Sequence, residues 1–187
     1  MVVIARCAAC ALLAALISWQ AKGDEITPQL GATPGAEVLA DRAQIVFADG
    51  RGLPPGQGSV ADGARIYADR CADCHGVDGR GGSGGELAGG NPDLTVTPAD
   101  KTIGTFWPFA PTLFDFVRRA MPPTAPWSLQ DDEVYSLVAY LLSLNGLWRD
   151  DAALDARGLA AVRMPNRNGF VPIDAEVNVV PAPSTPR

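Results

Sequence analysis

The sequence predicts an all-α protein, a small helical bundle with long irregular extensions at both ends. Three segments each begin with a Ser or Thr that is followed three residues later by an Asp, and each continues with apolar residues at helical spacing. This is a capping-box pattern with Asp in place of Glu, and it marks the start of a helix. The 20 Gly and 16 Pro among 187 residues are many for a compact helical protein, so we expect much of the chain in loops.

The first 23 residues are predicted to be a cleaved signal peptide. Arg6 precedes an unbroken apolar run at residues 7–17, and Ala21 and Gly23 supply small residues for cleavage. The run is too short to span a bilayer, which takes about 20 apolar residues, but it fits the apolar part of a secretory leader. The alternative, an uncleaved membrane anchor, would need a longer apolar stretch. We therefore expect a periplasmic protein without a stable membrane span after cleavage.

The composition excludes several classes of function. A single His cannot build a three-histidine metal centre or a bis-histidine haem. The net charge of −6 argues against a nucleic-acid partner, because binding phosphates needs a basic surface. Cleavage would remove Arg6, Lys22 and two of the four cysteines but no acidic residue. The mature chain would then carry 13 basic and 21 acidic side chains, a net charge of −8.

Residues 24–58 are predicted to form an N-terminal extension, and the first helix follows. Ser59 and Asp62 are its expected cap. Gly63, Tyr67 and Cys71 lie four residues apart, so they share one face of this helix, which is expected to end near Cys71.

The segment Cys71-Ala72-Asp73-Cys74-His75 is a C-x-x-C-H motif, the attachment sequence of c-type haem. Two thiols at this spacing can reach the vinyl groups of one porphyrin, and the adjacent imidazole can bind its iron. A zinc site would need a fourth ligand, and no further Cys or His remains after cleavage. A redox pair or a plain disulfide is the remaining alternative. We expect one covalently bound haem c, with His75 as an axial iron ligand.

The second axial ligand cannot be another His. Met121 is favoured because it lies just past the second predicted helix and before two prolines, which keep its thioether in a loop. Met164 and Lys101 are alternatives, and Met121 could instead be an ordinary core residue. His/Met ligation leaves no open position on the iron, so it indicates outer-sphere electron transfer and no catalysis by the chain itself.

Residues 79–90 contain seven glycines. No Gly-Lys-Ser/Thr follows them, so we expect a loop that wraps a porphyrin edge and not a phosphate-binding loop. The second helix is predicted to begin at Thr112, with Asp115 in its capping box.

Four residues near this second helix are candidate haem contacts. Arg118 and Arg119 could pair with a haem propionate, or else face solvent. Trp107 and Trp127 bracket the helix and the loop that carries Met121, and we expect both to pack against the porphyrin.

The third helix is predicted to begin at Ser128, with Asp131 in its capping box, and to end at Asn145-Gly146. Residues 147–187 are predicted to form a C-terminal extension whose last residues are disordered.

Residues 59–146 resemble a class I cytochrome c domain. Gly63 and Tyr67 match the family's Gly-x-x-x-aromatic sequence before C-x-x-C-H, and Tyr140-Leu141 matches its last helix. The resemblance implies that the first and last helices cross at Gly63.

The same resemblance assigns two roles near the iron. It implies that the carbonyl of Pro92 accepts the second imidazole N–H of His75, which would fix the ring and its basicity. It also implies that the Met121-Pro122 sequence carries the axial thioether.

A narrower resemblance extends over roughly residues 44–170. Segments 52–60, 107–122 and 164–170 look like those of the monohaem cytochrome subunits of periplasmic molybdenum sulfite dehydrogenases, and of the cytochrome partner of sulfane dehydrogenase. The resemblance implies a molybdenum-containing sulfite or sulfane dehydrogenase subunit as electron donor, and a downstream cytochrome or terminal oxidase as acceptor. The extensions would then wrap the core or bind the dehydrogenase. A free electron shuttle and a ligand-binding haem protein are the alternatives.

Overall fold

The computed structural model describes residues 31–42 and 45–171. The predicted signal peptide and the end of the C-terminal extension lie outside the described residues. The helix α2 (Ala36–Arg42) carries Glu37 in its first turn. It spans the boundary between a first compact unit, which ends at Leu39, and a second unit, which begins at Ala40.

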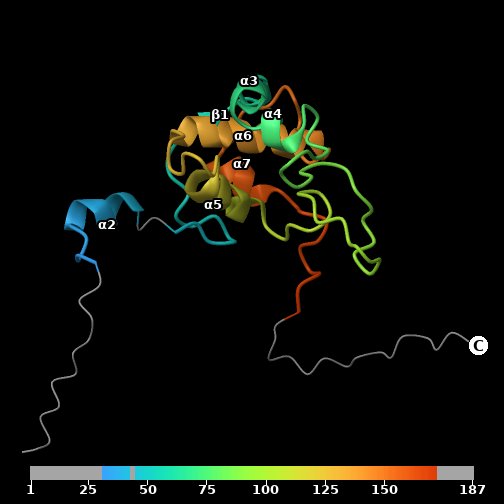
Figure 1. Ribbon diagram of the computed structural model, residues 1–187, viewed down its shortest axis with the longest axis horizontal. Coiled ribbons are helices and arrows are strands. Elements are labelled where there is room, and N and C mark those ends of the chain that lie inside the picture. Colours follow the sequence, from blue (N-terminus) through green and yellow to red (C-terminus); the bar gives the residue numbers. More distant parts are fainter. Residues whose placement is uncertain (1–30, 43–44, 172–187) are drawn as a thin grey trace, which may run out of the picture. The chain divides into compact units, whose positions relative to one another are not determined.

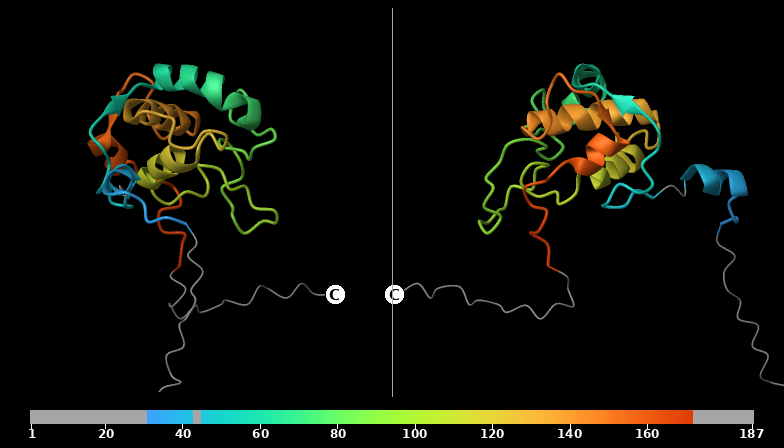
Figure 2. Two further views of the ribbon diagram at one scale, coloured as in Figure 1. Left: turned by 60° about the vertical axis from the view of Figure 1, so that its left-hand side comes forward. Right: turned by 180° about the vertical axis from the view of Figure 1, so that it is seen from behind.

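The second unit is a helical bundle, so the predicted all-α fold is confirmed. Figures 1 and 2 show α6 between α3 on one side and α5 and α7 on the other. Two very short strands pair antiparallel, with Gln57 opposite Asp155 and Gly58 opposite Leu154. None of the helices in the described ranges is long and apolar enough to cross a membrane. The elements of this unit are β1 (Gln57–Gly58), α3 (Val60–Arg70), α4 (Ala72–His75), α5 (Ala110–Ala120), α6 (Asp131–Leu144), β2 (Leu154–Asp155) and α7 (Ala156–Ala161).

The helices α3 and α6 cross at Gly63, as predicted. A Cβ atom at Gly63 would overlap the carbonyl oxygen of Ser136 and would stand 2.8 Å from the Cβ of Tyr140. Glycine therefore permits a backbone approach that no other residue would allow. Beside the crossing, the rings of Tyr67 and Tyr140 pack with their centroids 5.2 Å apart.

The start of α3 is also as predicted. The Ser59 hydroxyl accepts the backbone N–H of Asp62 at 3.1 Å, and Val60 is the first helical residue. This bond satisfies one of the N–H groups that a helix leaves free at its first turn.

The predicted starts of the other two main helices were wrong by two or three residues. The helix α5 begins at Ala110, because Pro111 has a backbone angle that suits the first turn of a helix and no N–H to leave unsatisfied. Thr112 lies inside the helix and donates its hydroxyl to the carbonyl of Phe109 at 2.7 Å. The helix α6 begins at Asp131 after a capping box of Gln130 and Glu133, which takes the role assigned to Ser128.

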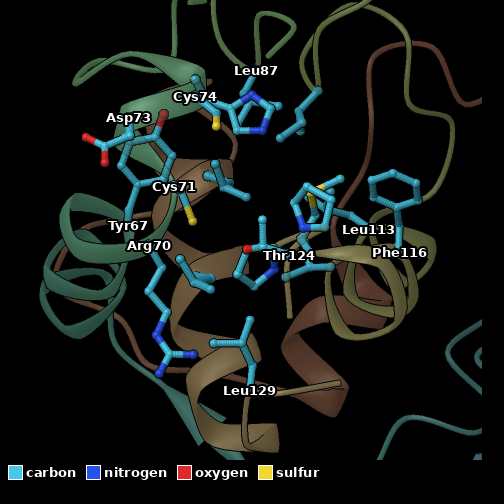
Figure 3. Close-up of a pocket in the computed structure, with 18 of the residues that line it drawn as sticks. Tyr67, Arg70, Cys71, Asp73, Cys74, Leu87, Leu113, Phe116, Thr124 and Leu129 are labelled. Carbon is cyan, nitrogen blue, oxygen red and sulfur yellow. The ribbon is translucent and has the colours of Figure 1, made fainter. Parts of the chain in front are cut away.

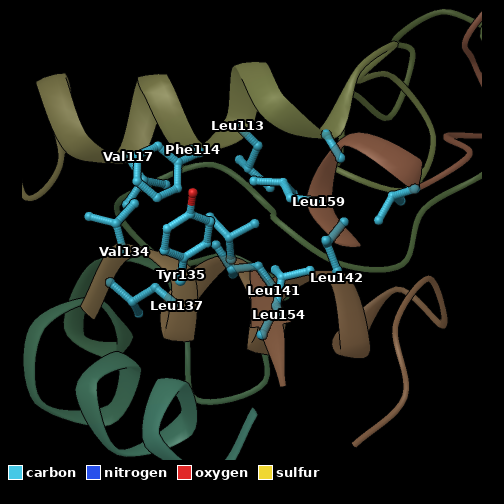
Figure 4. Close-up of a cluster of buried hydrophobic side chains, with 14 of the residues drawn as sticks. Leu113, Phe114, Val117, Val134, Tyr135, Leu137, Leu141, Leu142, Leu154 and Leu159 are labelled. Carbon is cyan, nitrogen blue, oxygen red and sulfur yellow. The ribbon is translucent and has the colours of Figure 1, made fainter. Parts of the chain in front are cut away.

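The core lies between α5, α6 and α7 (Figure 4). The rings of Phe114 and Tyr135 pack with centroids 4.6 Å apart. The buried Tyr135 hydroxyl donates to the carbonyl of Pro54 at 2.7 Å, which ties the segment before β1 to the core. Burial of each large apolar side chain stabilises such a core by about 1.5–3 kcal/mol.

Residues from both predicted extensions belong to the same core. Val46 comes from the N-terminal extension, and Leu154, Leu159 and Met164 come from the C-terminal one; all four are buried. The segments that carry these four residues therefore pack on the bundle, and the helix α7 lies within a segment that had been expected to be irregular.

Candidate haem-binding site

An apolar cavity of about 280 Å³ lies between α4 and α5 (Figure 3). Cys71 and Cys74 stand on the side of α4, and Leu113 and Phe116 of α5 stand on the other side. Leu129 contributes to the wall from the loop that follows α5. Most of the lining is aliphatic or aromatic, as a porphyrin face requires.

The C-x-x-C-H motif forms its own short helix against this cavity. The backbone N–H of Cys71 donates to the Tyr67 carbonyl at 2.9 Å, and that of His75 donates to the Cys71 carbonyl at 3.0 Å. Gly76 ends α4 with a φ of 78°, and its carbonyl accepts the Tyr67 hydroxyl at 2.7 Å. This geometry places Cys71, Cys74 and His75 on the cavity wall together.

The two motif cysteines are free thiols and not a disulfide. The Cys71 side chain points into the cavity (Figure 3), where burial raises the pKa of its thiol to about 11. Cys74 also lines the cavity but is exposed, so it lies at the rim.

His75 is oriented by the glycine-rich loop. Its Nδ1 lies 2.7 Å from the carbonyl oxygen of Gly85. A carbonyl can only accept, so Nδ1 carries the proton and Nε2 keeps a lone pair for a metal. The loop is held in place by the N–H of Gly84, which donates to the Cys74 carbonyl at 2.7 Å.

The prediction that Pro92 supplies this acceptor is therefore wrong. Pro92 is exposed and lies further along the same loop. The loop folds back on the motif earlier than expected, because its successive glycines permit tight turns, and Gly85 is the residue that reaches the imidazole.

Met121 follows the last residue of α5 and lines the cavity. Its backbone N–H donates to the Val117 carbonyl at 3.0 Å, after which the chain leaves the helix. The two alternative ligands do not line the cavity. Met164 is 3% exposed within the hydrophobic core, and the Lys101 ammonium lies 5.4 Å from the centroid of the Phe106 ring.

Of the candidate haem contacts, Trp107 lines the cavity and packs against Phe116 with ring centroids 5.6 Å apart. Arg118, Arg119 and Trp127 are not among the lining residues. The two arginines pair with protein carboxylates: Arg118 with Asp131 and Arg119 with Asp115.

The charged side chains on the cavity wall are Arg70 and Asp73, and neither was predicted. Their positions in the sequence next to the motif cysteines could have indicated that they line the cavity. Arg70 directly precedes the first cysteine of the motif, and Asp73 lies between the two cysteines.

The donor set fits a haem: two thiols, one imidazole and one thioether line a single apolar cavity. The family model for cytochrome c matches residues 60–145. The chain belongs to the c-type cytochromes and has their class I fold, and members of this family transfer electrons.

Within this family, the chain is similar to a protein of known structure, the sulfane dehydrogenase SoxCD from Paracoccus pantotrophus. The sequence identity is 39% and the TM-score is 0.72, over 82% of this chain and 76% of that chain.

Proposed function

We propose that this protein is an exported electron-transfer cytochrome with one covalently bound haem c. The observation that carries the proposal is that Cys71, Cys74, His75 and Met121 line the same apolar cavity. The two cysteines would hold the porphyrin through thioether bonds, and Nε2 of His75 and the sulfur of Met121 would bind the iron. The bound group supplies a one-electron ferric/ferrous couple.

The chain itself has three tasks in this proposal. The Gly85 carbonyl fixes the tautomer and the orientation of His75. The aliphatic and aromatic lining would keep water from the porphyrin faces. Met121 would supply the second axial ligand, and an iron with two protein ligands would have no site for oxygen or a substrate.

Haem attachment is tested by expressing the protein with a system that matures c-type cytochromes. We expect the wild-type chain to retain its haem after denaturation and to show a c-type spectrum on reduction. Cys71→Ala should weaken covalent attachment, because one of two thioether bonds is lost. Full attachment in Cys71→Ala and Cys74→Ala alike would contradict the proposed role of the motif.

The axial assignment is tested with a matched pair of methionine variants. Met121→Ala should abolish the methionine–iron charge-transfer band of the ferric protein. Met164→Ala should retain the band but lower the free energy of unfolding by about 2–5 kcal/mol, because Met164 is a buried core residue. Loss of the band in Met164→Ala alone would reverse the assignment.

We further infer that the electron donor is a molybdenum-containing sulfite or sulfane dehydrogenase subunit. The support is the 39% identity to a chain of SoxCD over most of both chains, since SoxCD is itself a sulfane dehydrogenase. A downstream cytochrome or a terminal oxidase would accept the electron.

The donor is tested by copurification and by reduction kinetics. Sulfite or a sulfane compound should reduce the cytochrome only when the dehydrogenase subunit is present. The net charge of −8 expected after leader cleavage predicts a basic or neutral docking patch on the partner. With a basic patch, the association rate should fall as salt is added, and an unchanged rate would count against electrostatic steering. Equal reduction by unrelated dehydrogenases would favour a free electron shuttle instead.

The periplasmic location rests on the predicted leader. N-terminal sequencing of the mature protein should find Asp24, or a residue within a few positions of it, at the first cycle. A mature protein that still begins at Met1 would contradict cleavage.

A further inference from the structure

The loop of residues 121–130 joins α5 to α6 and forms part of the cavity wall. Met121, Pro122, Pro123, Thr124 and Leu129 of this loop all line the cavity. Since Met121 is the first residue of the loop, the position of its thioether depends on how firmly the loop is held.

Trp127 lies near the end of this loop and contacts both arginines at the end of α5. The Arg118 and Arg119 guanidinium carbons lie 5.3 Å and 5.2 Å from the centroid of the Trp127 ring. The Trp127 backbone N–H also donates to the Arg118 carbonyl at 3.2 Å. Cation–π contacts are strongest on tryptophan, so these contacts tie the loop to the helix end.

The backbone of Trp127 shows that these contacts constrain it. Its φ of 63° is in the left-handed region, which bulky side chains rarely adopt. A residue keeps such a conformation only when its surroundings hold it there. The ring contacts and the backbone hydrogen bond to Arg118 provide that constraint.

Both arginines are themselves fixed by carboxylates. Arg118 Nη2 lies 3.3 Å from Asp131 Oδ1, and the Arg118 side chain is only 12% exposed. Arg119 Nε lies 2.8 Å from Asp115 Oδ1. Asp131 is the first residue of α6 and Asp115 belongs to α5, so the arginines connect Trp127 to the helices on both sides of the loop.

We propose that Arg118, Arg119 and Trp127 form a clamp that holds the 121–130 loop closed and thereby limits how often Met121 leaves the iron. The proposal rests on the ligation of Met121 proposed above. These three are positioning residues, since none of them lines the cavity. An external ligand can replace Met121 only when the loop opens, and opening must break the contacts of Trp127.

The clamp is tested with imidazole, which binds ferric haem iron where methionine leaves. At saturating imidazole, the rate at which the methionine–iron band disappears equals the rate of loop opening. We expect Trp127→Ala to open about tenfold faster than wild type, because two cation–π contacts are lost. Trp127→Phe keeps an aromatic face and should fall between the two.

Two comparisons separate the clamp from general damage. Trp127→Gly removes the ring but relieves the positive φ, so it should open as fast as Trp127→Ala if the ring matters. Arg118→Gln and Arg119→Gln should also open faster. Arg149→Gln, which removes an exposed arginine paired with Asp151, should leave the rate unchanged.

The outcomes distinguish the clamp from the axial assignment. A wild-type protein without the methionine–iron band overturns the ligation of Met121, and the clamp with it. A band that is present and disappears at the wild-type rate in Trp127→Ala and Trp127→Gly overturns the clamp alone. The free energy of unfolding of each variant is measured alongside, and a rate that rises only in proportion to lost global stability also counts against the clamp.

Discussion

The imidazole of His75 is oriented by the backbone of the glycine-rich loop. Its Nδ1–H donates to the Gly85 carbonyl, and the preceding residue, Gly84, lies directly against the ring. A Cβ at Gly84 would stand 2.9 Å from Cε1 and 3.0 Å from Nδ1 of His75. Only glycine lets the loop approach this closely, so Gly84 is as necessary to the ring position as the hydrogen bond itself.

Gly84→Ala should therefore displace the loop and weaken the hydrogen bond to Gly85. A weaker bond makes the imidazole a poorer donor to ferric iron, so the reduction potential should rise. Gly85→Ala is the matched control, since a Cβ at Gly85 would meet nothing within 4 Å. Potentiometric titration measures both variants, and equal potentials for the two would contradict this account.

At this scale the sequence predicts side-chain chemistry well and backbone partners poorly. The motif identified Cys71, Cys74 and His75 as a group, and the structure places all three on one cavity. The acceptor for His75 was wrong, because any residue offers a carbonyl and nothing in its side chain marks it. The carboxylate partners of the arginines, Asp115 and Asp131, were not predicted, because the sequence does not specify how the ends of α5 and α6 pack.

The crossing of α3 and α6 positions the motif, because only Cys71 separates the end of α3 from the start of α4. Gly63→Ala would normally stabilise an exposed helix by about 1 kcal/mol through helix propensity. Here the added methyl group would collide with the Ser136 carbonyl, so we expect the free energy of unfolding to fall by about 1–3 kcal/mol.

Denaturant unfolding measures this effect, with Ala68→Gly as the control on the exposed face of the same helix. That control changes propensity without changing the crossing and should cost about 1 kcal/mol. A Gly63→Ala variant that is more stable than wild type would contradict this account, because it would show that α3 and α6 can move apart without lowering the free energy of unfolding.

Helix starts show why local patterns can mislead. A Ser or Thr followed three residues later by Asp occurs at all three predicted starts, but it acts as a cap only at Ser59. At α5 the proline in the first turn decides the start, and at α6 the reciprocal bonds of Gln130 and Glu133 decide it. The predictions failed where a stronger N-terminal signal lay within two or three residues of a weaker one.

Across the whole molecule, the segment after α6 completes the core. Leu159 is fully buried, so Leu159→Ala should lower the free energy of unfolding by about 2–5 kcal/mol. Val171 is 63% exposed, so Val171→Ala is the matched control and should change the free energy of unfolding by less than about 0.5 kcal/mol. Equal free energies of unfolding for the two variants would mean that the segment after α6 does not contribute to the stability of the core.

The stability of the whole chain should also depend on alkaline pH. Burial raises the pKa of Tyr67 and of Tyr135 from 10.0 to about 12. Above pH 10 the unfolded chain therefore loses these protons before the folded chain does. The contribution of these groups to stability is fully present below pH 10 and is lost as the pH rises through 12.

Denaturant unfolding across this pH range checks the expectation, and Tyr135→Phe should show a shallower decline than wild type. An identical decline in the variant would mean that the ionisation of Tyr135 does not contribute to the loss of stability at alkaline pH.

The docking of the extensions was beyond what the sequence could specify. The strands β1 and β2 have two residues each, which is too few for an alternating pattern. Their pairing brings together Gln57 and Asp155, which are far apart in the sequence. Such contacts depend on how the helices of the core pack, and the sequence around each strand does not predict that packing.

That pairing also bears on the order of events while the protein is made. A chain emerges from its N-terminus, so Cys71 and Cys74 appear well before Leu154 and Leu159, which fill the core. Contacts between distant segments form slowly, because the intervening chain must be ordered first. The late arrival of β2 and α7 would keep the motif accessible as the exported chain emerges from the membrane, which gives haem-attaching enzymes an interval to act before the bundle closes around the Cys71 thiol.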